Sequence, residues 1–137
     1  MRTKGFWYLA TPYSAYPDGP EAAYIRACER AAALIAAGVT VFCPIAHSHP
    51  IARHGALPGG GAHDVWLAVD EPFLQAARGL IVAADMPGAY FSTGVTHEIG
   101  VMAQAGKPGV HWTSERTAED IARIIGDLEA RQERAAS

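Results

Sequence analysis

The sequence has few cysteines and no long apolar run, and each shortage excludes a class of protein. Cys28 and Cys43 are the only cysteines among 137 residues, too few for a disulfide framework and not at the spacing of a zinc site. No apolar run reaches the roughly 20 residues that span a bilayer. Residues 1–4 lead directly into the apolar residues 6–10, without the longer apolar segment and cleavage site of a signal peptide. We therefore expect a cytoplasmic protein without a membrane partner, in which both cysteines are buried thiols.

An excess of positive charge is also missing. The chain has 11 Lys and Arg against 14 Asp and Glu, which gives a formal net charge of -3. This balance excludes the broad basic surface that binds polymeric nucleic acid or anionic lipid, although a local pocket could hold one phosphate. Half of the residues are apolar and 18% are charged, which is typical of a globular domain and not of disorder. We expect residues 1–137 to form a single domain.

Apolar runs and helix-forming segments alternate along the chain. Runs rich in β-branched and aromatic residues predict strands at 6–10, 39–43, 80–84 and 109–112. Their nearly continuous hydrophobicity is typical of strands covered on both faces, as in a parallel sheet. Helices are predicted at 21–37, 64–77, 93–105 and 118–134, and glycine follows the first and third of them. The alternation predicts an α/β fold, doubly wound and flavodoxin- or Rossmann-like, with three α/β/α layers and four or five parallel strands.

Residues 44–61 break this alternation, because they are rich in proline, glycine and histidine and show no sustained period. We predict a long loop, and long loops within compact domains usually carry function. The loop follows the second strand and therefore lies at the carboxyl edge of the sheet, where open α/β folds bind ligands. Residues 11–20 and 85–92 should converge on the same edge. Pro58–Gly61 lacks the context of a phosphate-binding P-loop, and we interpret it as a flexible lid.

Glu98 occupies an unusual place for a carboxylate. Val95, Ile99 and Met102 recur with helical spacing and mark the buried stripe of the predicted helix, and Glu98 falls within that stripe. A buried carboxylate without a partner is costly, and its pKa rises unless donors keep it ionised. Glu98 is either a functional acid, or a structural residue that pairs with a buried cation or caps a loop.

Asp70 repeats this pattern on the preceding helix. It projects onto an apolar face formed by four other residues, which are Trp66, Phe73, Leu74 and Ala77. Pro72 would kink a helix at this point, and if the helix begins near Asp70, that residue is simply its N-cap. Otherwise two inward carboxyl groups lie beside one crevice. That pair suits glycosidic bond cleavage, in which one carboxylate attacks the anomeric carbon and an acid assists the leaving group.

Three segments resemble the nucleoside 2-deoxyribosyltransferase superfamily, which includes the 2'-deoxynucleoside 5'-phosphate N-hydrolases. They are Trp7–Tyr13 (WYLATPY), the Asp70 helix that leads into Leu80–Val82, and Ser92–Gly100 (STGVTHEIG), with Gly-Lys-Pro following at 106–108. The resemblance covers residues 6–112. It implies that Glu98 is the nucleophile, that Tyr8 hydrogen-bonds and orients it, and that Asp70 is an acid near the base and sugar.

The resemblance also bears on the substrate. The transferases have an aspartate six residues before the nucleophile, whereas this chain has Ser92 at that position. In this respect the chain resembles the nucleotide hydrolases, in which a serine contacts the 5'-phosphate. A neutral hydroxyl at a helix N-terminus suits an anion better than a carboxylate does. We therefore expect a nucleoside monophosphate, with Ser92 as the main phosphate ligand. Ser14 is a second candidate, although it could equally be a turn serine. An aspartate commonly precedes the third strand in the family, and Arg78 here is either a surface residue or a charge in the pocket.

The remaining candidates are assigned to substrate binding. They are Thr11 and Gly94 from the matched motifs, Tyr13 and Trp66 as rings that could stack on a base, and His47 as the loop histidine that hydrogen-bonds the base or phosphate. Such aromatic residues more commonly pack in the core. His47-Ser48-His49 superficially suggests a metal site, but no third ligand or supporting shell accompanies it. We expect neither a metal ion nor a cofactor.

Two functions are consistent with these features. In the first, Glu98 attacks C1' of a nucleoside or nucleotide, and water or a second base resolves the glycosyl-enzyme. In the second, the chain is a non-catalytic nucleotide-binding module of the same fold, in which Glu98 binds the sugar hydroxyls. The sequence does not distinguish the base, ribose from deoxyribose, or hydrolase from transferase. By resemblance we expect a homodimer or higher homo-oligomer, with the alanine-rich final helix as a candidate interface.

Overall fold

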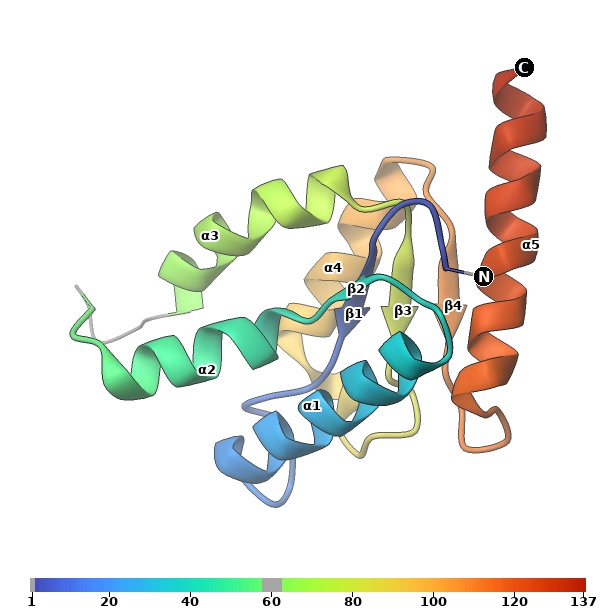
Figure 1. The fold of residues 1–137 in the computed structure, drawn as a ribbon. Helices are drawn as coiled ribbons and strands as arrows, with labels where there is room; N and C mark the ends of the chain where they lie inside the picture. Colours follow the sequence, from blue (N-terminus) through green and yellow to red (C-terminus); the bar gives the residue numbers. More distant parts are fainter. Residues whose placement is uncertain (1, 58–62) are drawn as a thin grey trace.

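A computed structural model describes residues 2–57 and 63–137 as a parallel sheet with helices on both faces (Figure 1). The elements in chain order are β1 (Trp7–Ala10), α1 (Pro20–Ala36), β2 (Val41–Phe42), α2 (Pro44–His54), α3 (His63–Ala76), β3 (Leu80–Val82), η2 (Ala89–Phe91), α4 (Thr93–Gln104), β4 (Gly109–His111) and α5 (Ala118–Ala136). The described strands are ordered β2-β1-β3-β4, and all neighbours are parallel. This order matches the first four strands of a flavodoxin-like sheet, and it confirms the predicted three-layer α/β fold.

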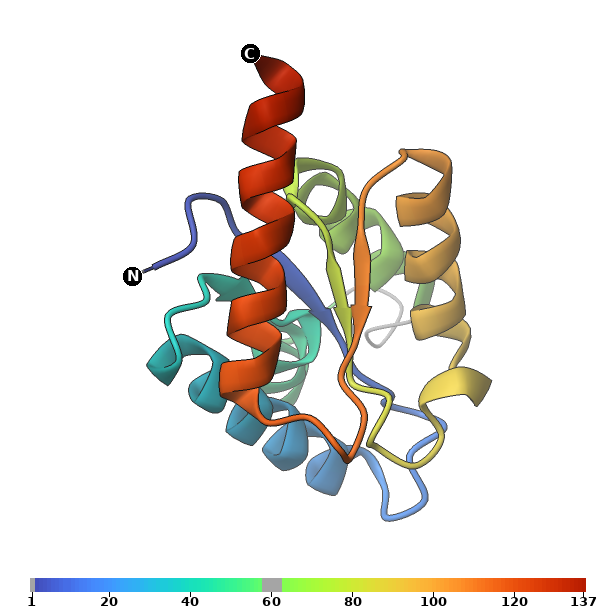
Figure 2. The same ribbon diagram turned by 90° about the vertical axis from the view of Figure 1, so that its right-hand side faces the viewer.

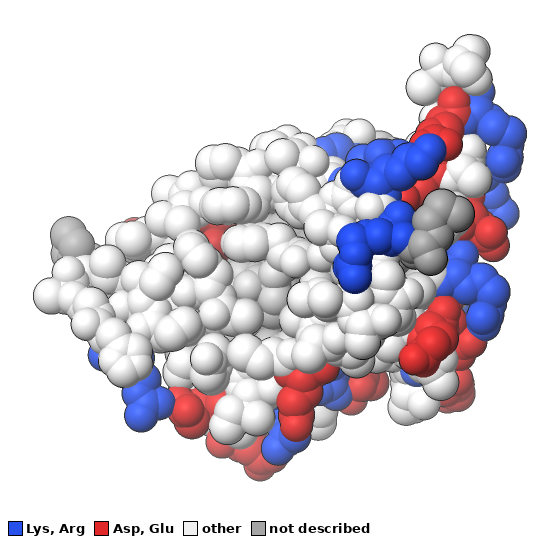
Figure 3. Space-filling view, viewed as in Figure 1, with Lys and Arg blue, Asp and Glu red and all other residues white. Residues whose placement is uncertain are grey.

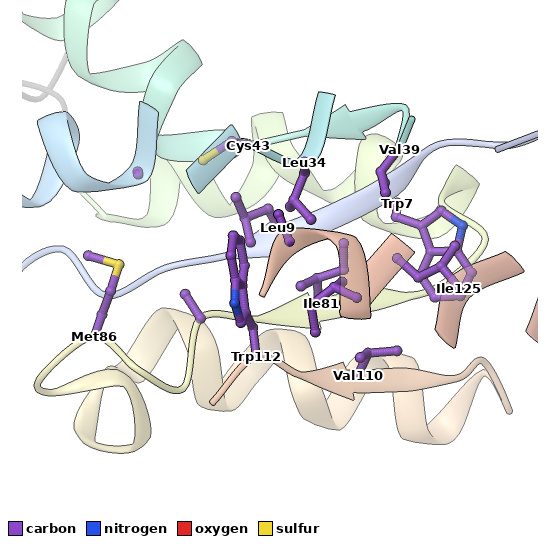
Figure 4. Close-up of a cluster of buried hydrophobic side chains, with 14 residues drawn as sticks. Trp7, Leu9, Leu34, Val39, Cys43, Ile81, Met86, Val110, Trp112 and Ile125 are labelled. Carbon is purple, nitrogen blue, oxygen red and sulfur yellow. The ribbon is translucent and has the colours of Figure 1, made fainter. Parts of the chain in front are cut away.

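The two faces of β1 bury separate cores. Trp7 and Leu9 belong to a cluster with α1 and α5, which includes Leu34 and Ile125 (Figure 4). The alternate residues, among them Tyr8, pack on the other face against α3 and α4. Figure 2 shows α1 and α5 on one side of the sheet and α4 on the other. The strand period of two therefore points Tyr8 toward the layer that carries Glu98 and Asp70.

Glycine ends two of the helices as predicted. Gly38 follows α1 with φ 100°, and its N–H donates to Ile35 O at 3.1 Å while Val39 N–H donates to Leu34 O at 2.9 Å. The same pair of bonds closes α4 around Gly106, which has φ 69°. This arrangement is a Schellman motif, which needs a left-handed residue just past the helix. Each helix therefore stops where the next strand must begin.

The predicted long loop at 44–61 is wrong for its first part, because residues 44–54 form α2. Pro44 stands at the start of this helix, where a missing N–H costs nothing. Pro50 lies inside it, where proline normally costs about 3 kcal/mol, and packing of α2 on α1 and β1 outweighs that cost. Pro58–Gly61, interpreted above as a lid, lies outside the described residues.

The bounds of α3 show that Asp70 is not the N-cap of this helix. It begins at His63, so Asp70 is an interior residue and not an N-cap, and the helix continues through Pro72. Leu74 and Ala77 are buried as predicted, but Phe73 is 38% exposed and is not part of an inward face.

Cys43 is a buried thiol as predicted, whereas Cys28 is only half-buried.

Helix α5 packs on the sheet through its first half. Its buried side chains end at Glu129, and the remaining turns extend past the sheet in both views (Figures 1 and 2). Within residues 2–57 and 63–137, no helix has the length and apolarity to cross a membrane.

Candidate functional site

A cavity of about 390 Å³ lies at the carboxyl edge of the sheet. Its walls come from the loop after β1, from α2 and α3, and from the first turns of α4. Figure 3 shows few charged side chains over α2 and α3, and an acidic surface is visible in the hollow between the two helices. Every candidate residue from the sequence lines the cavity except Tyr8 and His47. The topology therefore gathers residues from three separate motifs into one pocket, as expected at the carboxyl ends of parallel strands.

Glu98 lies at the bottom of this cavity and is 9% exposed. Val95 and Met102, one turn away on either side, are fully packed against the sheet, so α4 turns Glu98 inward with its apolar stripe. Burial raises the pKa of Glu98 from an ordinary value of 4.5 to about 8; the Tyr8 phenol lowers it in part, and the charge of Asp70 raises it further. The described residues provide no cation bound to Glu98. Among the described residues, Glu98 therefore neither pairs with a buried cation nor caps a loop, which were the two structural roles considered for it.

Tyr8 lies beneath the cavity on β1 and is fully buried. Its ring packs against Phe42, with centroids 5.7 Å apart, and its hydroxyl is close enough to Glu98 to influence the titration of that group. Burial, followed by the Glu98 and Asp70 carboxyl groups, raises the pKa of Tyr8 above its ordinary value of 10. The phenol therefore keeps its proton at neutral pH and can act as a donor to Glu98.

Asp70 enters the cavity from α3. Burial raises its pKa from an ordinary 3.8 to about 6, and the nearby His47 lowers it in part. The charge of Asp70 also raises the pKa of Glu98. Two carboxyl groups with shifted pKa values in one cleft are typical of acid–base chemistry.

Three buried polar atoms at this site lack a hydrogen-bond partner. Among the described residues, the buried side-chain atoms without a partner are Tyr8 Oη, Thr11 Oγ1 and Asp70 Oδ1. Leaving such an atom unpaired costs about 1–3 kcal/mol, and native proteins contain few of them. Thr11 and Asp70 line the cavity, and Tyr8 lies below it. Their clustering indicates groups held ready for a ligand, because packing alone would distribute such defects.

The part of the cavity at the start of α4 is formed where two loops touch. Ser92 caps α4 by accepting a hydrogen bond from Val95 N–H at 3.2 Å, so its own proton is free to donate. Ser14 and Gly94 also line this part of the cavity. The loops meet at Gly88, where φ is 85° and an added Cβ would lie 2.4 Å from the Ala15 carbonyl oxygen. Only glycine fits there, and its presence brings the Ser14 loop to the start of α4.

His49 replaces His47 as the cavity histidine. The His47 ring faces Phe42 and Phe73, with centroids 5.8 and 6.1 Å away, whereas His49 lines the cavity and hydrogen-bonds Tyr13. Trp66 lines the wall opposite, on α3. The sequence analysis missed the histidine because it treated residues 44–61 as a loop. A helix begun at Pro44 would have placed Ser48 and His49 on the same side as Ala52, which follows them by about one turn.

Two further questions raised by the sequence have structural answers. Arg78 precedes β3 at the amino edge of the sheet, away from the cavity, and donates to the Gln132 side chain on α5 at 2.9 and 3.1 Å. It therefore adds no charge to the pocket. In the part of the chain that the structure describes, no three His, Cys, Asp or Glu side chains gather into a group that could hold a metal ion.

Comparison with known proteins gives a family without an assigned activity. No curated protein matches the chain. The family model described as a domain of unknown function, DUF1937, matches residues 5–114, a span that contains β1 to β4 and every residue of the cavity described above. The chain therefore belongs to the DUF1937 family.

Proposed function

We propose that this protein cleaves the N-glycosidic bond of a nucleoside 5'-monophosphate, of the 2'-deoxy series, with Glu98 as nucleophile. The observation that carries the proposal is the grouping of a buried glutamate, a second shifted carboxyl group and three unpaired polar atoms around one cavity. Cleavage of a glycosidic bond needs two carboxyl groups with different protonation states beside the sugar. The resemblance of the Tyr8, Asp70 and Glu98 segments to the nucleoside 2-deoxyribosyltransferase superfamily agrees with this chemistry.

In the first step, an ionised Glu98 oxygen forms a bond to C1' while the bond from C1' to the base nitrogen breaks. The electron pair of that bond leaves with the base, which gains a proton from Asp70. At neutral pH Asp70 and Glu98 together hold about one proton. Because the pKa of Glu98 is the higher of the two, the proton is mainly on Glu98 before the reaction. The positive charge that develops on the sugar reverses this preference, because an adjacent cation stabilises the carboxylate. During the step Glu98 is therefore ionised and Asp70 is protonated, as the reaction requires.

In the second step, water or a second base attacks C1' of the glycosyl-enzyme and Glu98 leaves. With water the protein is a hydrolase, and with a base it is a transferase. Tyr8 supports both steps by donating its phenolic proton to Glu98 and so holding the reacting oxygen in place. Asp70, which lost its proton in the first step, accepts one from the attacking group.

The 5'-phosphate is assigned to the end of the cavity that contains Ser14, Ser92 and Gly94. The first turn of α4 offers backbone N–H groups and the positive end of its dipole, and the Ser92 hydroxyl has a proton to donate. Gly94 leaves room there, because an added Cβ would lie 3.8 Å from Ser92 Oγ. This arrangement favours an anionic group at the start of α4 and the reacting sugar one turn further on, at Glu98.

The proposal is tested by chromatography of released base. Wild type, Glu98→Gln and Glu71→Gln are incubated with ribo- and deoxyribonucleoside monophosphates and with the free nucleosides, in the presence and absence of an acceptor base. Glu71, on α3 next to Asp70, accepts a hydrogen bond from Gln75 at 2.9 Å, lies 3.7 Å from His97 and does not line the cavity, so it is the matched control. We expect wild type and Glu71→Gln to release base and Glu98→Gln to be slower by about 10⁴-fold or more.

A second measurement separates an enzyme from a binding module. A 2-fluorinated deoxynucleotide analogue slows the second step and should leave a glycosyl adduct on Glu98 that is visible by mass spectrometry. If no member of the panel loses its base and no adduct forms, while nucleotides still bind, the chain is a nucleotide-binding module of this fold and the enzymatic proposal is wrong.

A further inference from the structure

A chain of hydrogen bonds crosses the wall of the cavity at Tyr13. The Tyr13 hydroxyl is 2.8 Å from His49 Nδ1, and His49 Nε2 is 2.8 Å from Glu21 Oε2. The three residues come from the loop after β1, from α2 and from the first turn of α1. The His49 side chain is only 10% exposed. Tyr13 and His49 both line the cavity, whereas Glu21 lies on the outside.

The chemistry of the three groups determines where the protons lie. Hydrogen bonds to His49 and Arg53 lower the pKa of Glu21 despite an opposing effect of burial, so Glu21 is an ionised acceptor. His49 Nε2 must then carry a proton, and in the neutral ring Nδ1 is an acceptor. Tyr13 therefore donates its proton to His49, and its oxygen presents only lone pairs to the cavity. In this state Tyr13 binds a donor and repels an anion.

The charge of the cavity makes this state unsuitable for a phosphate. Among the described residues, the lining contains no Lys or Arg but includes the two acids Asp70 and Glu98. The lining groups that can become cationic are His49 and His63. An anion that enters the cavity would therefore be balanced by a proton taken up from solvent. Of these two histidines, His49 is the one with hydrogen-bond partners on both ring nitrogens within residues 2–57 and 63–137.

We propose that His49 is a positioning residue that takes up a proton when the anionic group of the ligand binds, and thereby converts Tyr13 from an acceptor into a donor. The proton comes from solvent and binds to Nδ1. The Tyr13 oxygen then accepts from Nδ1–H, and Tyr13 keeps its own proton and donates it to the anion. This inference rests on the proposed function, in which the anionic group is the 5'-phosphate of the substrate.

The surroundings of His49 are compatible with both the neutral imidazole and the imidazolium. Glu21 accepts from Nε2 in both states and stabilises the imidazolium. The Tyr24 ring stacks on His49 with centroids 4.4 Å apart, which also favours a cation. Arg53 opposes protonation, but its own charge is directed to Glu21 at 2.8 Å. Tyr13, Glu21, Tyr24 and Arg53 are the titratable or charged groups around the ring, and none can supply the proton at neutral pH.

The test is a calorimetric titration that counts protons. The probe is 2-deoxyribose 5-phosphate, which contains the phosphate without requiring knowledge of the base, and inorganic phosphate and 2-deoxyribose serve as partial probes. All titrations use Glu98→Gln as background, so that Glu98 neither reacts nor titrates. Binding heats are measured in buffers of different ionisation enthalpy, which gives the number of protons taken up. His49→Gln and Tyr13→Phe are compared with His54→Gln, an exposed control at the end of the same helix, and with His63→Gln.

We expect uptake of about one proton with the sugar phosphate at pH 8, and an affinity that falls about tenfold for each further pH unit. His49→Gln should abolish the uptake and flatten this pH dependence, and Tyr13→Phe should weaken binding. His54→Gln and His63→Gln should behave like the background protein, and 2-deoxyribose should bind without proton uptake. Weak binding of inorganic phosphate with the same proton count would also support the proposal.

The proposal is overturned if the sugar phosphate does not bind, if it binds without proton uptake, or if the uptake persists in His49→Gln or disappears in His63→Gln. The outcomes that concern proton uptake are independent of the catalytic proposal, because no base is released in the titrations, whereas a sugar phosphate that does not bind would also contradict the proposed phosphate site. Conversely, release of base by the wild type with no proton uptake in the titrations would leave the glycosidase and remove the role of His49.

Discussion

Glu98 and Glu129 are both buried glutamates, but their surroundings give them opposite properties. Glu129 accepts hydrogen bonds from Lys4 N–H at 2.9 Å, Gly5 N–H at 3.3 Å and the Trp7 indole at 3.0 Å. Burial by itself raises the pKa of Glu129, but these donors hold it below the ordinary value. Glu98 is 9% exposed, and within residues 2–57 and 63–137 no backbone N–H or indole donates to it; its pKa rises to about 8 although the Tyr8 phenol lowers it in part. A buried carboxylate held by several donors is typical of a structural role, whereas one with a raised pKa in a cavity indicates function.

This difference predicts how stability depends on pH at Glu98. Below about pH 4.5 Glu98 is protonated in both the folded and the unfolded chain; between pH 4.5 and 8 only the unfolded chain ionises, so folding becomes less favourable as the pH rises. Glu98→Gln removes this loss. We expect the variant to be more stable than wild type, by on the order of 2–4 kcal/mol at pH 8 and by little at pH 4.5. Denaturant unfolding across this range measures the difference, and a gain that is equal at every pH would contradict the buried, protonated state.

Asp70 predicts a shift in the pH profile of the reaction. Because the charge of Asp70 raises the pKa of Glu98, Asp70→Asn should lower that pKa. Because the first step needs one proton on the pair, kcat/KM of the wild type should be highest between about pH 6 and 8 and fall above pH 8, whereas in Asp70→Asn it should rise through the lowered pKa of Glu98 and show no fall. The variant should also lose about 10²–10⁴-fold in kcat, because the base leaves without an acid. A profile whose position does not change would show that the two carboxyl groups are not coupled.

At the scale of elements, the ends of the helices determine where several cavity-lining segments begin and end. Ser92 both caps α4 and lines the cavity, so a residue that determines where the helix begins also faces the cavity in which the substrate is proposed to bind. Gly38 and Gly106 end α1 and α4 and direct the chain back into β2 and β4. Gly88 allows the loop before α4 to approach Ala15. The position of the cavity therefore depends on the backbone conformations of a few residues at or near the helix ends.

Two substitutions at Ser92 separate its capping role from its role toward the ligand. Ser92→Ala removes the cap and should cost about 1 kcal/mol of stability, together with the hydroxyl donor. Ser92→Asp keeps the cap but adds a negative charge, so stability should be retained while the KM for nucleoside monophosphates rises about tenfold or more. The KM for free nucleosides should change little. Thermal unfolding and steady-state kinetics measure the two effects, and equal changes in KM for both substrates would exclude a phosphate at this end.

At the scale of the whole molecule, α5 joins the two ends of the chain. Glu129 on α5 binds the backbone that precedes β1, and Gln132 accepts from Arg78 ahead of β3. These contacts lie at the amino edge of the sheet, whereas the cavity lies at the carboxyl edge. The family model ends at residue 114, before α5 begins at Ala118.

Glu129→Ala tests this division. The substitution leaves the Trp7 indole and two backbone N–H groups without their acceptor, and we expect a loss of about 2–4 kcal/mol in the free energy of unfolding. The loss should diminish below about pH 4, because the stabilisation by a carboxylate of lowered pKa disappears as the pH falls through that pKa. Glycosidic activity of the folded protein should be unchanged, since Glu129 lies away from the cavity. Chemical unfolding at pH 7 and pH 3.5 and an activity assay at low temperature check these points.

Much of the fold and part of the site could be predicted from the sequence by itself. Apolar runs of four or five residues and helical stripes closed by Gly38 and Gly106 determined the order of strands and helices, because these signals depend on neighbouring residues alone. The inward position of Glu98 followed from the same local periodicity. Helix α2 was not predicted, because its prolines and histidines have no strong helical preference, and contacts with α1 and β1 stabilise it. The partnership of Tyr13, His49 and Glu21 was equally hidden, since it joins three elements. Only the tertiary structure decides which polar atoms are paired and which are left for a ligand, because hydrogen bonds and desolvation depend on distances between residues far apart in the chain.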